Sequence, residues 1–323
     1  MIKKILFRCD AGEKKELGTG HLIRSISLAK MLVKYENIKK KNIMFLVKTN
    51  GKFSISKKIL NIENFTYKTI NETIKDFSIK EAKKVLENNF ELIIIDRLGK
   101  INRNFIKILK KYKKKIICFD VFLKKKSLCD MTVNPLIFNK EYKIQNHFSG
   151  HKFNILPSNL IKKKLKKKIS IKKVFLSFGG YDSKNLMKIT RKILNDKHEF
   201  KILKVSDKIK FNSKKKFFEK MQESDLVISS GGLTMFDALN FHKPVIAIPQ
   251  YHHQRKNIKR LSELGLVKLI EKKEILNLIN IINKMDKKFL KITLKKIKVF
   301  NKKQEFRLIL KKIKYVYEYN FSN

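Results

Sequence analysis

The sequence predicts an α/β protein of two domains, each built on a parallel sheet. Three observations support this prediction. Short β-rich runs alternate with helical periods in both halves of the chain. Each half also has a glycine-centred loop between a strand-like run and a helix-like run, at 18–21 and at 229–232. A length of 323 residues exceeds one ordinary core and suits two domains of roughly 150 residues each.

The first half contains a βαβ unit. Leu22, Ile26, Ala29 and Val33 recur at helical spacing between two strand-like runs, which gives a helix with one buried face. The predicted strands of this half are 4–7, 43–47, 92–95 and 116–119.

The second half repeats the alternation of strands and helices. Its predicted strands are 174–178, 200–205, 226–229, 245–248 and 266–270. A lysine run headed by Pro157 separates the halves, as a linker would. We therefore expect an N-terminal domain over 1–157, a linker over 158–173, and a C-terminal domain over 174–323 that ends in helices packing back on the body.

The formal net charge of +49 suggests nucleic acid or an anionic membrane as a partner, because a basic surface attracts polyanions. The lysines, however, stand in scattered short runs and do not alternate with aromatic residues on one helix. Lysine, isoleucine, asparagine and phenylalanine are abundant and tryptophan is absent, which is typical of an AT-rich coding sequence. We interpret the lysines as a solvated surface, expect no specific nucleic-acid partner, and leave peripheral membrane contact open.

The cysteine spacing and the hydropathy favour a reduced, cytoplasmic location. Cys9, Cys118 and Cys129 form no Cys-x-x-Cys pair, so neither a disulfide framework nor a zinc site is indicated. No apolar run approaches the ~20 residues that span a bilayer. The first ten residues reach charged side chains before a signal-like core forms.

Three predicted strands of the first half end at an aspartate, namely Asp10, Asp96 and Asp120. Carboxyl ends of parallel strands are where ligands bind in such sheets, although each aspartate could instead cap the following helix. Asp10 shares a loop with the glycines at 18 and 20 and with His21. A neutral imidazole in the first turn of the helix could take a proton from water, with Arg24 one turn further on.

Two loops of the second half are candidates for phosphate binding. Gly179 and Gly180 follow one strand, and the Ser-Ser-Gly-Gly stretch at 229–232 follows another and opens a helix. Unpaired amides at a helix N-terminus favour an anion. Asp237 lies about one turn inside that helix, where it could accept hydrogen bonds from ribose hydroxyls.

Two other kinds of site are disfavoured. His242, His252 and His253 have no carboxylate or cysteine at a convincing ligand spacing, so we expect no metal site there. The glycines at 18 and 20 do not make a dinucleotide fingerprint, because Ile23 stands where the third glycine would be.

Taken together, the motifs resemble the nucleotide-sugar hydrolases of pseudaminic acid biosynthesis, relatives of the MurG-type glycosyltransferases. The resemblance spans roughly residues 1 to 270. It rests on Phe-Arg-Cys-Asp at 7–10 leading to Gly-Thr-Gly-His-Leu-Ile-Arg at 18–24, on Phe-Gly-Gly-Tyr-Asp at 178–182, and on Ile-Ser-Ser-Gly-Gly-Leu-Thr at 228–234 continuing to Ile-Pro-Gln at 248–250.

The resemblance implies a GT-B fold, in which two Rossmann-like domains face an interdomain cleft. It also implies a substrate, UDP-2,4-diacetamido-2,4,6-trideoxy-β-L-altropyranose, that is cut to UDP and the free sugar without a metal or other cofactor. As catalytic residues, His21 would activate water and Asp10 would support the same loop. We expect the protein to be a monomer. The implied substrate-binding residues are Arg8, Gly18, Gly20, Arg24, Asp96, Gly179, Gly180, Ser230, Gly231, Gly232, Thr234, Asp237, Gln250 and Gln254.

Three alternatives stay open at this point. A glycosyltransferase on the same scaffold would need a lipid or glycan acceptor. A noncatalytic polyanion-binding protein would bind through its lysines in a salt-dependent way. A homologue could also keep the fold and lack activity, because a fold does not imply a function.

Overall fold

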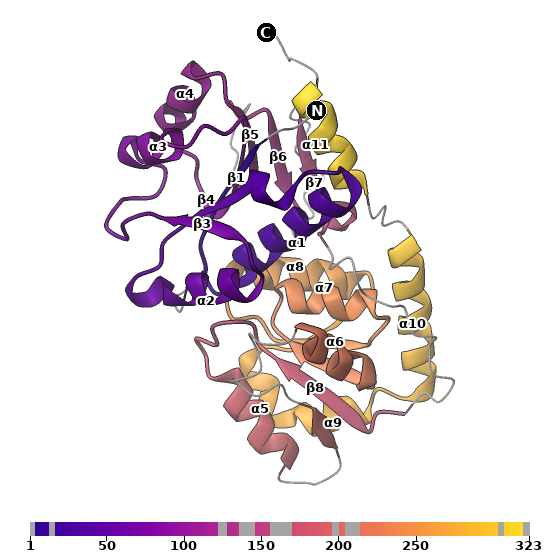
Figure 1. Ribbon diagram of the computed structural model, residues 1–323. Helices are drawn as coiled ribbons and strands as arrows, with labels where there is room; N and C mark the ends of the chain where they lie inside the picture. The colour runs from indigo at the N-terminus through magenta and orange to yellow at the C-terminus, as the bar shows by residue number, and fades with distance from the viewer. Residues whose placement is uncertain are drawn as a thin grey trace. The chain divides into compact units, whose positions relative to one another are not determined.

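The computed structural model describes residues 4–12, 17–121, 128–135, 146–155, 170–195, 200–203, 214–302 and 307–318. They divide into two units (Figure 1). The first unit comprises Met1–Ser158 together with Glu305–Asn323, and the second comprises Asn159–Gln304.

Within the described residues, the first unit holds a seven-stranded sheet in the order β3-β2-β1-β4-β5-β6-β7, parallel throughout. The strands are β1 Ile5–Cys9, β2 Ile43–Val47, β3 Thr66–Thr69, β4 Leu92–Gly99, β5 Lys115–Val121, β6 Met131–Asn134 and β7 His147–Ser149. The four predicted strands are confirmed as β1, β2, β4 and β5. The sequence did not reveal β3, which is mostly exposed, or β6 and β7, which are short.

Both faces of this sheet are covered. On one face, Leu22, Ile26 and Ala29 of α1 are fully buried, as their helical spacing predicts. On the other face, Ala82 and Phe105 from α3 and α4 join a cluster with alternate residues of the strands. The helices of the first unit are α1 Gly20–Tyr35, α2 Ser54–Ile62, α3 Ile79–Leu86, α4 Arg103–Lys111 and α11 Leu308–Glu318, with short helices η1 Lys40–Asn42, η2 Gly51–Phe53 and η3 His151–Phe153.

The described part of the second unit holds a five-stranded parallel sheet in the order β12-β11-β10-β8-β9. Its strands are β8 Lys173–Ser177, β9 Lys201–Leu203, β10 Leu226–Ser229, β11 Val245–Ala247 and β12 Lys268–Leu269. Its helices are α5 Leu186–Asn195, α6 Lys214–Glu223, α7 Leu233–Asn240, α8 His252–Glu263, η4 Lys272–Asn277, α9 Leu278–Asn283 and α10 Lys287–Lys302. All five predicted strands are confirmed, with slightly different ends, and positions 204 and 205 of the predicted strand 200–205 lie outside the described residues.

The last helix lies with the first unit, whereas the sequence analysis placed all of 174–323 in the C-terminal domain. Helix α11 buries Ile309, Leu310 and Ile313, and the Tyr317 hydroxyl donates a hydrogen bond to the Glu91 carboxylate of the first unit. These apolar positions cannot reveal which of two sheets the helix covers. Most of the predicted linker at 158–173 lies outside the described residues.

Both sheets have a point where the strand order reverses, between β1 and β4 in the first unit and between β8 and β10 in the second. Ligands of open α/β sheets bind beyond the carboxyl ends of the strands at such a point. The loops after β1, β8 and β10 are the glycine-centred loop at 18–21, the Gly179 loop and the glycine-centred loop at 229–232 that the sequence singled out. Among the described residues, no helix has the length and apolar character that a membrane span requires.

Candidate functional site

His21 lies in the first turn of α1, directly after the loop that leaves β1. Helix α1 begins at Gly20, as the sequence predicts. Gly18 has φ +51, a left-handed conformation that glycine adopts without strain, and its carbonyl accepts a hydrogen bond from the Gly12 amide at 2.9 Å. This turn places the His21 side chain, which is 12% exposed, at the carboxyl edge of the sheet.

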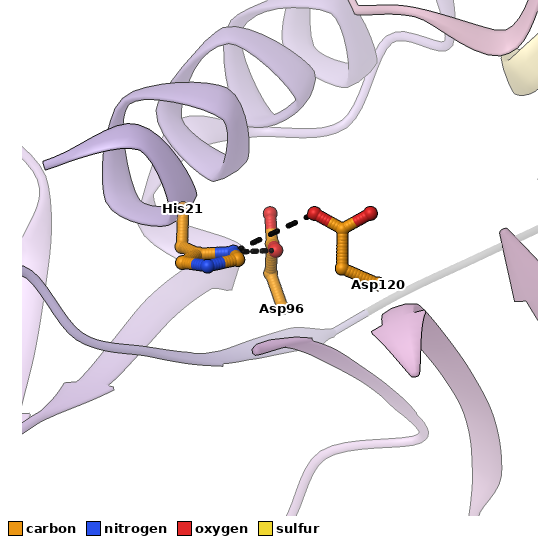
Figure 2. Close-up of side chains that lie close together, drawn as sticks. All are labelled: His21, Asp96 and Asp120. Carbon is orange, nitrogen blue, oxygen red and sulfur yellow. Dashed lines mark hydrogen bonds and ion pairs between the residues drawn. The ribbon is translucent and has the colours of Figure 1, made fainter. Parts of the chain in front are cut away.

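Two carboxylates from neighbouring strands approach the His21 imidazole (Figure 2). Its Nδ1 lies 2.8 Å from Oδ1 of Asp96, at the end of the regular pairing of β4, and 3.9 Å from Oδ2 of Asp120 on β5. Arg24, one turn along α1, connects the same carboxylates. Its Nε donates to Asp96 at 2.9 Å, and its Nη2 donates both to Asp96 and, at 2.6 Å, to Asp120.

The hydrogen-bond network assigns a tautomer to His21. Nη2 of Arg24 carries two hydrogens, and both point to carboxylates at distances shorter than its 3.2 Å separation from His21 Nδ1. Nδ1 is therefore the donor to Asp96, and in the neutral imidazole Nε2 carries the lone pair that can accept a proton. The assignment gives the neutral imidazole the orientation and tautomer that a general base needs.

Asp120 reaches this group because the backbone breaks the alternation of β5. Cys118 and Val121 belong to the core on the α3 and α4 face, whereas Phe119 lies under the Arg24 guanidinium on the α1 face. Simple alternation would send Asp120 to the α3 and α4 face. Its φ of +54, a region where aspartate is enriched among residues other than glycine, turns the carboxylate to Arg24 instead.

The charges of this group stabilise one another. Burial alone would raise the pKa of Asp96, but the charge and hydrogen bonds of Arg24, with a further contribution from His21, hold it below its usual range. Burial would lower the pKa of Arg24, and the two carboxylates raise it instead. Asp96 is therefore ionised and Arg24 charged under all ordinary conditions.

His21, Asp96 and Asp120 each offer one ligand atom, and these atoms lie within 4.8 Å of one another. One imidazole and two carboxylates are ligands that a divalent cation accepts. Here the Arg24 guanidinium bridges both carboxylates and already supplies a positive charge. A metal would have to displace it, and the prediction that the enzyme uses no metal stays a prediction.

Asp10 and Arg8 form a buried ion pair at the carboxyl end of β1, and the catalytic and substrate-binding roles predicted for them stay predictions. Asp10 is 2% exposed and accepts hydrogen bonds from Arg8 and from the Lys48 amide, each at 2.7 Å. Arg8 is fully buried and also donates to Glu81 of α3 at 2.7 Å. Asp10 thus contacts Arg8 and not His21, and the geometry supports a role for both residues in holding the ends of β1, β2 and α3 together.

Three further side chains extend this ion-pair network, and one of them, Asp76, is half exposed. Arg97, the next residue after Asp96, pairs with Glu81 and lies 3.1 Å from Asp76. Lys48 donates to Asp76 at 2.7 Å. Burial would raise the pKa of Asp10, but Arg8 and then Arg97 lower it. Because strand residues alternate, Asp96 faces α1 and Arg97 faces α3, so each network lies on its own side of the sheet.

In the second unit, the glycine loop before α7 combines a crowded position with an open one. A Cβ on Gly231 would lie 2.8 Å from two side-chain atoms of Ile258 in α8, so close packing requires glycine there. A Cβ on Gly232 would meet nothing within 4 Å. Gly232 is the N-cap of α7, where no side chain among the described residues caps the helix. Thr234 and Asp237 are half-buried on the first two turns.

The loop after β8 also leaves open space and is tied to the other loops by Gln250. Gly179 has φ +89, and a Cβ there would meet nothing within 4 Å; Gly180 is exposed. The Gln250 side chain donates to the Phe178 carbonyl at 2.7 Å and accepts from the Ser183 amide at 2.9 Å. The Gln250 amide donates to Gln254 at 3.0 Å. Gln250 and Gln254 thus fix the loop, and the substrate contact predicted for them stays a prediction.

Ser230 links the loop before α7 to the loop after β8. It is 4% exposed, and its hydroxyl donates to the Phe178 carbonyl at 3.5 Å. Open space beside glycine amides at an uncapped helix start is what a phosphate group needs.

Comparison with known proteins identifies the family. Residues 151–313, just over half of the chain, match the glycosyltransferase family 28 C-terminal domain. The chain belongs to this family. A relative, the uncharacterized protein MJ1062 of Methanocaldococcus jannaschii, is 29% identical over 297 residues, and the match covers 79% of this chain and 59% of the relative. The chain therefore spans less than two thirds of that relative's length.

Solved structures show the fold of this family 28 chain. MurG of Acinetobacter baumannii is similar with a TM-score of 0.64 at 10% identity, over 98% of this chain and 100% of MurG. The glycosyltransferase of kitacinnamycin has a TM-score of 0.63 at 9% identity, over 97% and 99% of the two chains. CalG4, the calicheamicin glycosyltransferase, has a TM-score of 0.60 at 9% identity, over 97% of this chain and 95% of CalG4. The predicted GT-B fold of two parallel-sheet α/β domains is confirmed, and the cleft between the domains stays a prediction.

Sequence reasoning missed several residues of the two networks in this family member. Asp120 was noted only as a strand-end acid, and the pairing of Asp96 with His21 was not foreseen. Glu81 stands among the lysines of α3, a context that indicates a solvated face, yet it is fully buried. The one available signal was its place in a Ser-x-x-Glu capping pattern, and the Ser78 hydroxyl does accept from the Glu81 amide at 3.2 Å.

Proposed function

We propose that this protein hydrolyses a UDP-sugar, UDP-2,4-diacetamido-2,4,6-trideoxy-β-L-altropyranose, to UDP and the free sugar in pseudaminic acid biosynthesis. The observation that carries the proposal is the His21–Asp96 pair at the strand-order reversal of the first sheet. The match to the glycosyltransferase family 28 C-terminal domain supports a nucleotide-sugar substrate. The motif resemblance supports this particular sugar.

In the proposed reaction, Nε2 of His21 takes a proton from water as the water oxygen attacks the anomeric carbon. The bond between that carbon and the β-phosphate oxygen breaks, and its electron pair leaves with UDP. Asp96 stabilises the imidazolium that forms and keeps Nδ1 as the donor. The proton then passes from His21 to solvent, so the products are UDP, the free sugar and one proton.

Arg24 and Asp120 are positioning residues in this scheme. Arg24 holds Asp96 by two hydrogen bonds. Asp120 accepts a hydrogen bond from the second hydrogen of Nη2, so that Arg24 does not donate to His21 Nδ1. A donation from Arg24 would favour the other tautomer, in which Nε2 carries the hydrogen and cannot act as a base.

The second unit binds the nucleotide in this proposal. The diphosphate lies against the amides at the start of α7 and beside the loop of Gly179 and Gly180, where a Cβ on Gly179 or Gly232 would meet open space. Asp237 and Thr234, on the first two turns of α7, contact the ribose and the phosphates. The amides and helix dipole stabilise the leaving UDP, so the proposed reaction needs no metal or cofactor. The proposal also takes the enzyme to be monomeric and cytoplasmic.

The test is incubation of the purified protein with this UDP-sugar in the absence of acceptor and metal, followed by NMR. The proposal requires release of both UDP and the free sugar, and loss of release in His21→Gln. Equal release by the His21→Gln variant would remove His21 from the mechanism.

A second candidate is transfer of the sugar from UDP to a lipid or glycan acceptor. The specific observations in its favour are the family 28 match and the likeness to glycosyltransferase structures. UDP release that begins only when an acceptor is added would favour transfer over hydrolysis.

A further inference from the structure

Helix α10 is a basic helix with two different long faces. Of its 16 residues, seven are lysine and none is acidic. Leu290, Thr293 and Ile297, spaced three and four residues apart, are 5% exposed or less and pack against the second unit. The Asn301 side chain also donates to the Leu239 carbonyl at 2.7 Å. These contacts anchor α10 along one face, at the edge of the second unit where Figure 1 shows the helix.

The other face of α10 exposes apolar side chains. Phe289, Ile292 and Val299 are 40%, 48% and 52% exposed. Their spacings of three and seven residues put them in one stripe along the helix. Soluble proteins bury such side chains when they can, so a row of three on one helix indicates a contact surface.

Lysines border this stripe. Lys288, Lys291 and Lys295 are exposed on one side of it. Lys296 stands within the stripe itself, four residues after Ile292 and three before Val299, and its Nζ lies 2.5 Å from where a Cβ of Gly265 would be. The residue before this glycine, Leu264, is itself 42% exposed and extends the apolar surface.

We infer that the exposed face of α10 docks on an anionic phospholipid surface. An apolar stripe bordered by lysines, without a single acid on the helix, is complementary to a bilayer interface, where acyl chains accept the apolar groups and headgroups pair with the ammonium groups. A soluble polyanion would use the lysines and have no place for Phe289, Ile292 and Val299. The inference concerns a surface separate from the proposed hydrolase site and does not depend on that function.

Helix α4 offers a matched control within the same chain. It is also basic and without an acid, and it exposes Arg103, Lys107 and Lys111 in one row. It differs from α10 in having no exposed apolar stripe, because Phe105, Ile106 and Leu109 are buried and Ile108 is half-buried. Replacement of these three side chains of α4 by Glu therefore changes the net charge as much as replacement of three lysines of α10. It leaves the lysines and the apolar stripe of α10 unchanged.

The experiment is co-sedimentation of the full chain with phosphatidylcholine vesicles that contain or lack phosphatidylglycerol. Wild-type protein binds the anionic vesicles and not the neutral ones. Each surface lysine strengthens such binding roughly fivefold, so Lys288→Glu, Lys291→Glu and Lys295→Glu together weaken it by about a hundredfold or more. Phe289→Ser, Ile292→Ser and Val299→Ser together weaken it by about tenfold or more. A thermal melt of each variant checks that it is folded.

Three results would overturn the inference. Failure of the wild-type protein to co-sediment with anionic vesicles would contradict the inference directly. Equal losses from charge reversal on α4 and on α10 would mean attraction by the diffuse charge of the whole chain. Unchanged vesicle binding by the folded serine variant, with equally tight binding to a homopolymeric RNA, would assign the lysines to polyanions in general.

Discussion

Asp96→Asn removes a single charge from the centre of the site and keeps the shape of the side chain. Asp96 is 1% exposed, and its two oxygens accept hydrogen bonds from His21 Nδ1 at 2.8 Å, from Nε and Nη2 of Arg24, and from the Ser25 hydroxyl at 3.2 Å. Asparagine has one oxygen, so some of these donors then face an NH₂ group. We expect the imidazole to lose both its fixed orientation and its tautomer.

The expected magnitudes follow from these bonds. Removal of one partner of a buried ion pair costs about 3–5 kcal/mol of unfolding free energy. Arg24 keeps its bond to Asp120 at 2.6 Å, so we expect a cost near the lower end, about 3 kcal/mol. A displaced general base lowers kcat by about a hundredfold to ten-thousandfold. The KM is expected to change little, because the proposed nucleotide contacts lie in the second unit.

The assay combines turnover of the UDP-sugar, urea unfolding, and calorimetric binding of UDP as a check that the second unit is intact. Asp120→Asn is the matched variant, since it keeps the His21–Asp96 bond and loses one bond to Arg24; we expect about a tenfold loss of kcat there. A folded Asp96→Asn enzyme with kcat within about tenfold of wild type would refute the proposed role of this carboxylate.

Three other predictions concern the second unit and acid stability. Gly231→Ala should lower the unfolding free energy by about 1–3 kcal/mol in urea titrations, because its Cβ would lie 2.8 Å from a buried isoleucine. Its matched variant, Gly232→Ala, should leave stability unchanged and weaken UDP binding roughly tenfold by calorimetry. Unchanged UDP affinity in that matched variant would mean that the phosphates do not bind at this glycine. Gln250→Leu should also weaken UDP binding, because it releases the loop that contacts the Phe178 carbonyl; an affinity equal to that of wild type would contradict the link. The third concerns Asp10 and Asp96, whose burial is outweighed by neighbouring arginines, so that each has a folded-state pKa below its unfolded value. The unfolded state then binds more protons, and urea midpoints should fall as the pH drops below about 4; midpoints that stay constant down to about pH 3 would contradict these directions.

Local features of the site could be predicted from the sequence. A strand, a glycine turn and a helix are encoded by neighbouring residues, so the position of His21 at the start of α1 and of Gly232 at the start of α7 followed from spacing alone. The same holds for the central strands, whose apolar runs are continuous because both faces of a parallel sheet are buried. The exposed edge strand β3 has no such run.

Contacts between distant segments could not be predicted from one sequence. His21 and Asp96 are 75 residues apart, and they meet only because β4 pairs beside β1 with Cys9 opposite Asp96. Asp120 depends on a single positive φ that breaks strand alternation. Glu81 depends on α3 covering the face from which Arg8 projects. Strand order, register and helix placement decide these pairings, and periodicity specifies none of them.

The most direct test of the account is hydrolysis of the UDP-sugar in water labelled with heavy oxygen, without acceptor, followed by mass spectrometry of the released UDP. Attack of water on the anomeric carbon predicts UDP that carries no label, and no UDP release by His21→Gln. Label in the β-phosphate of UDP, or UDP release only after an acceptor is added, would contradict hydrolysis at the anomeric carbon by a His21-activated water.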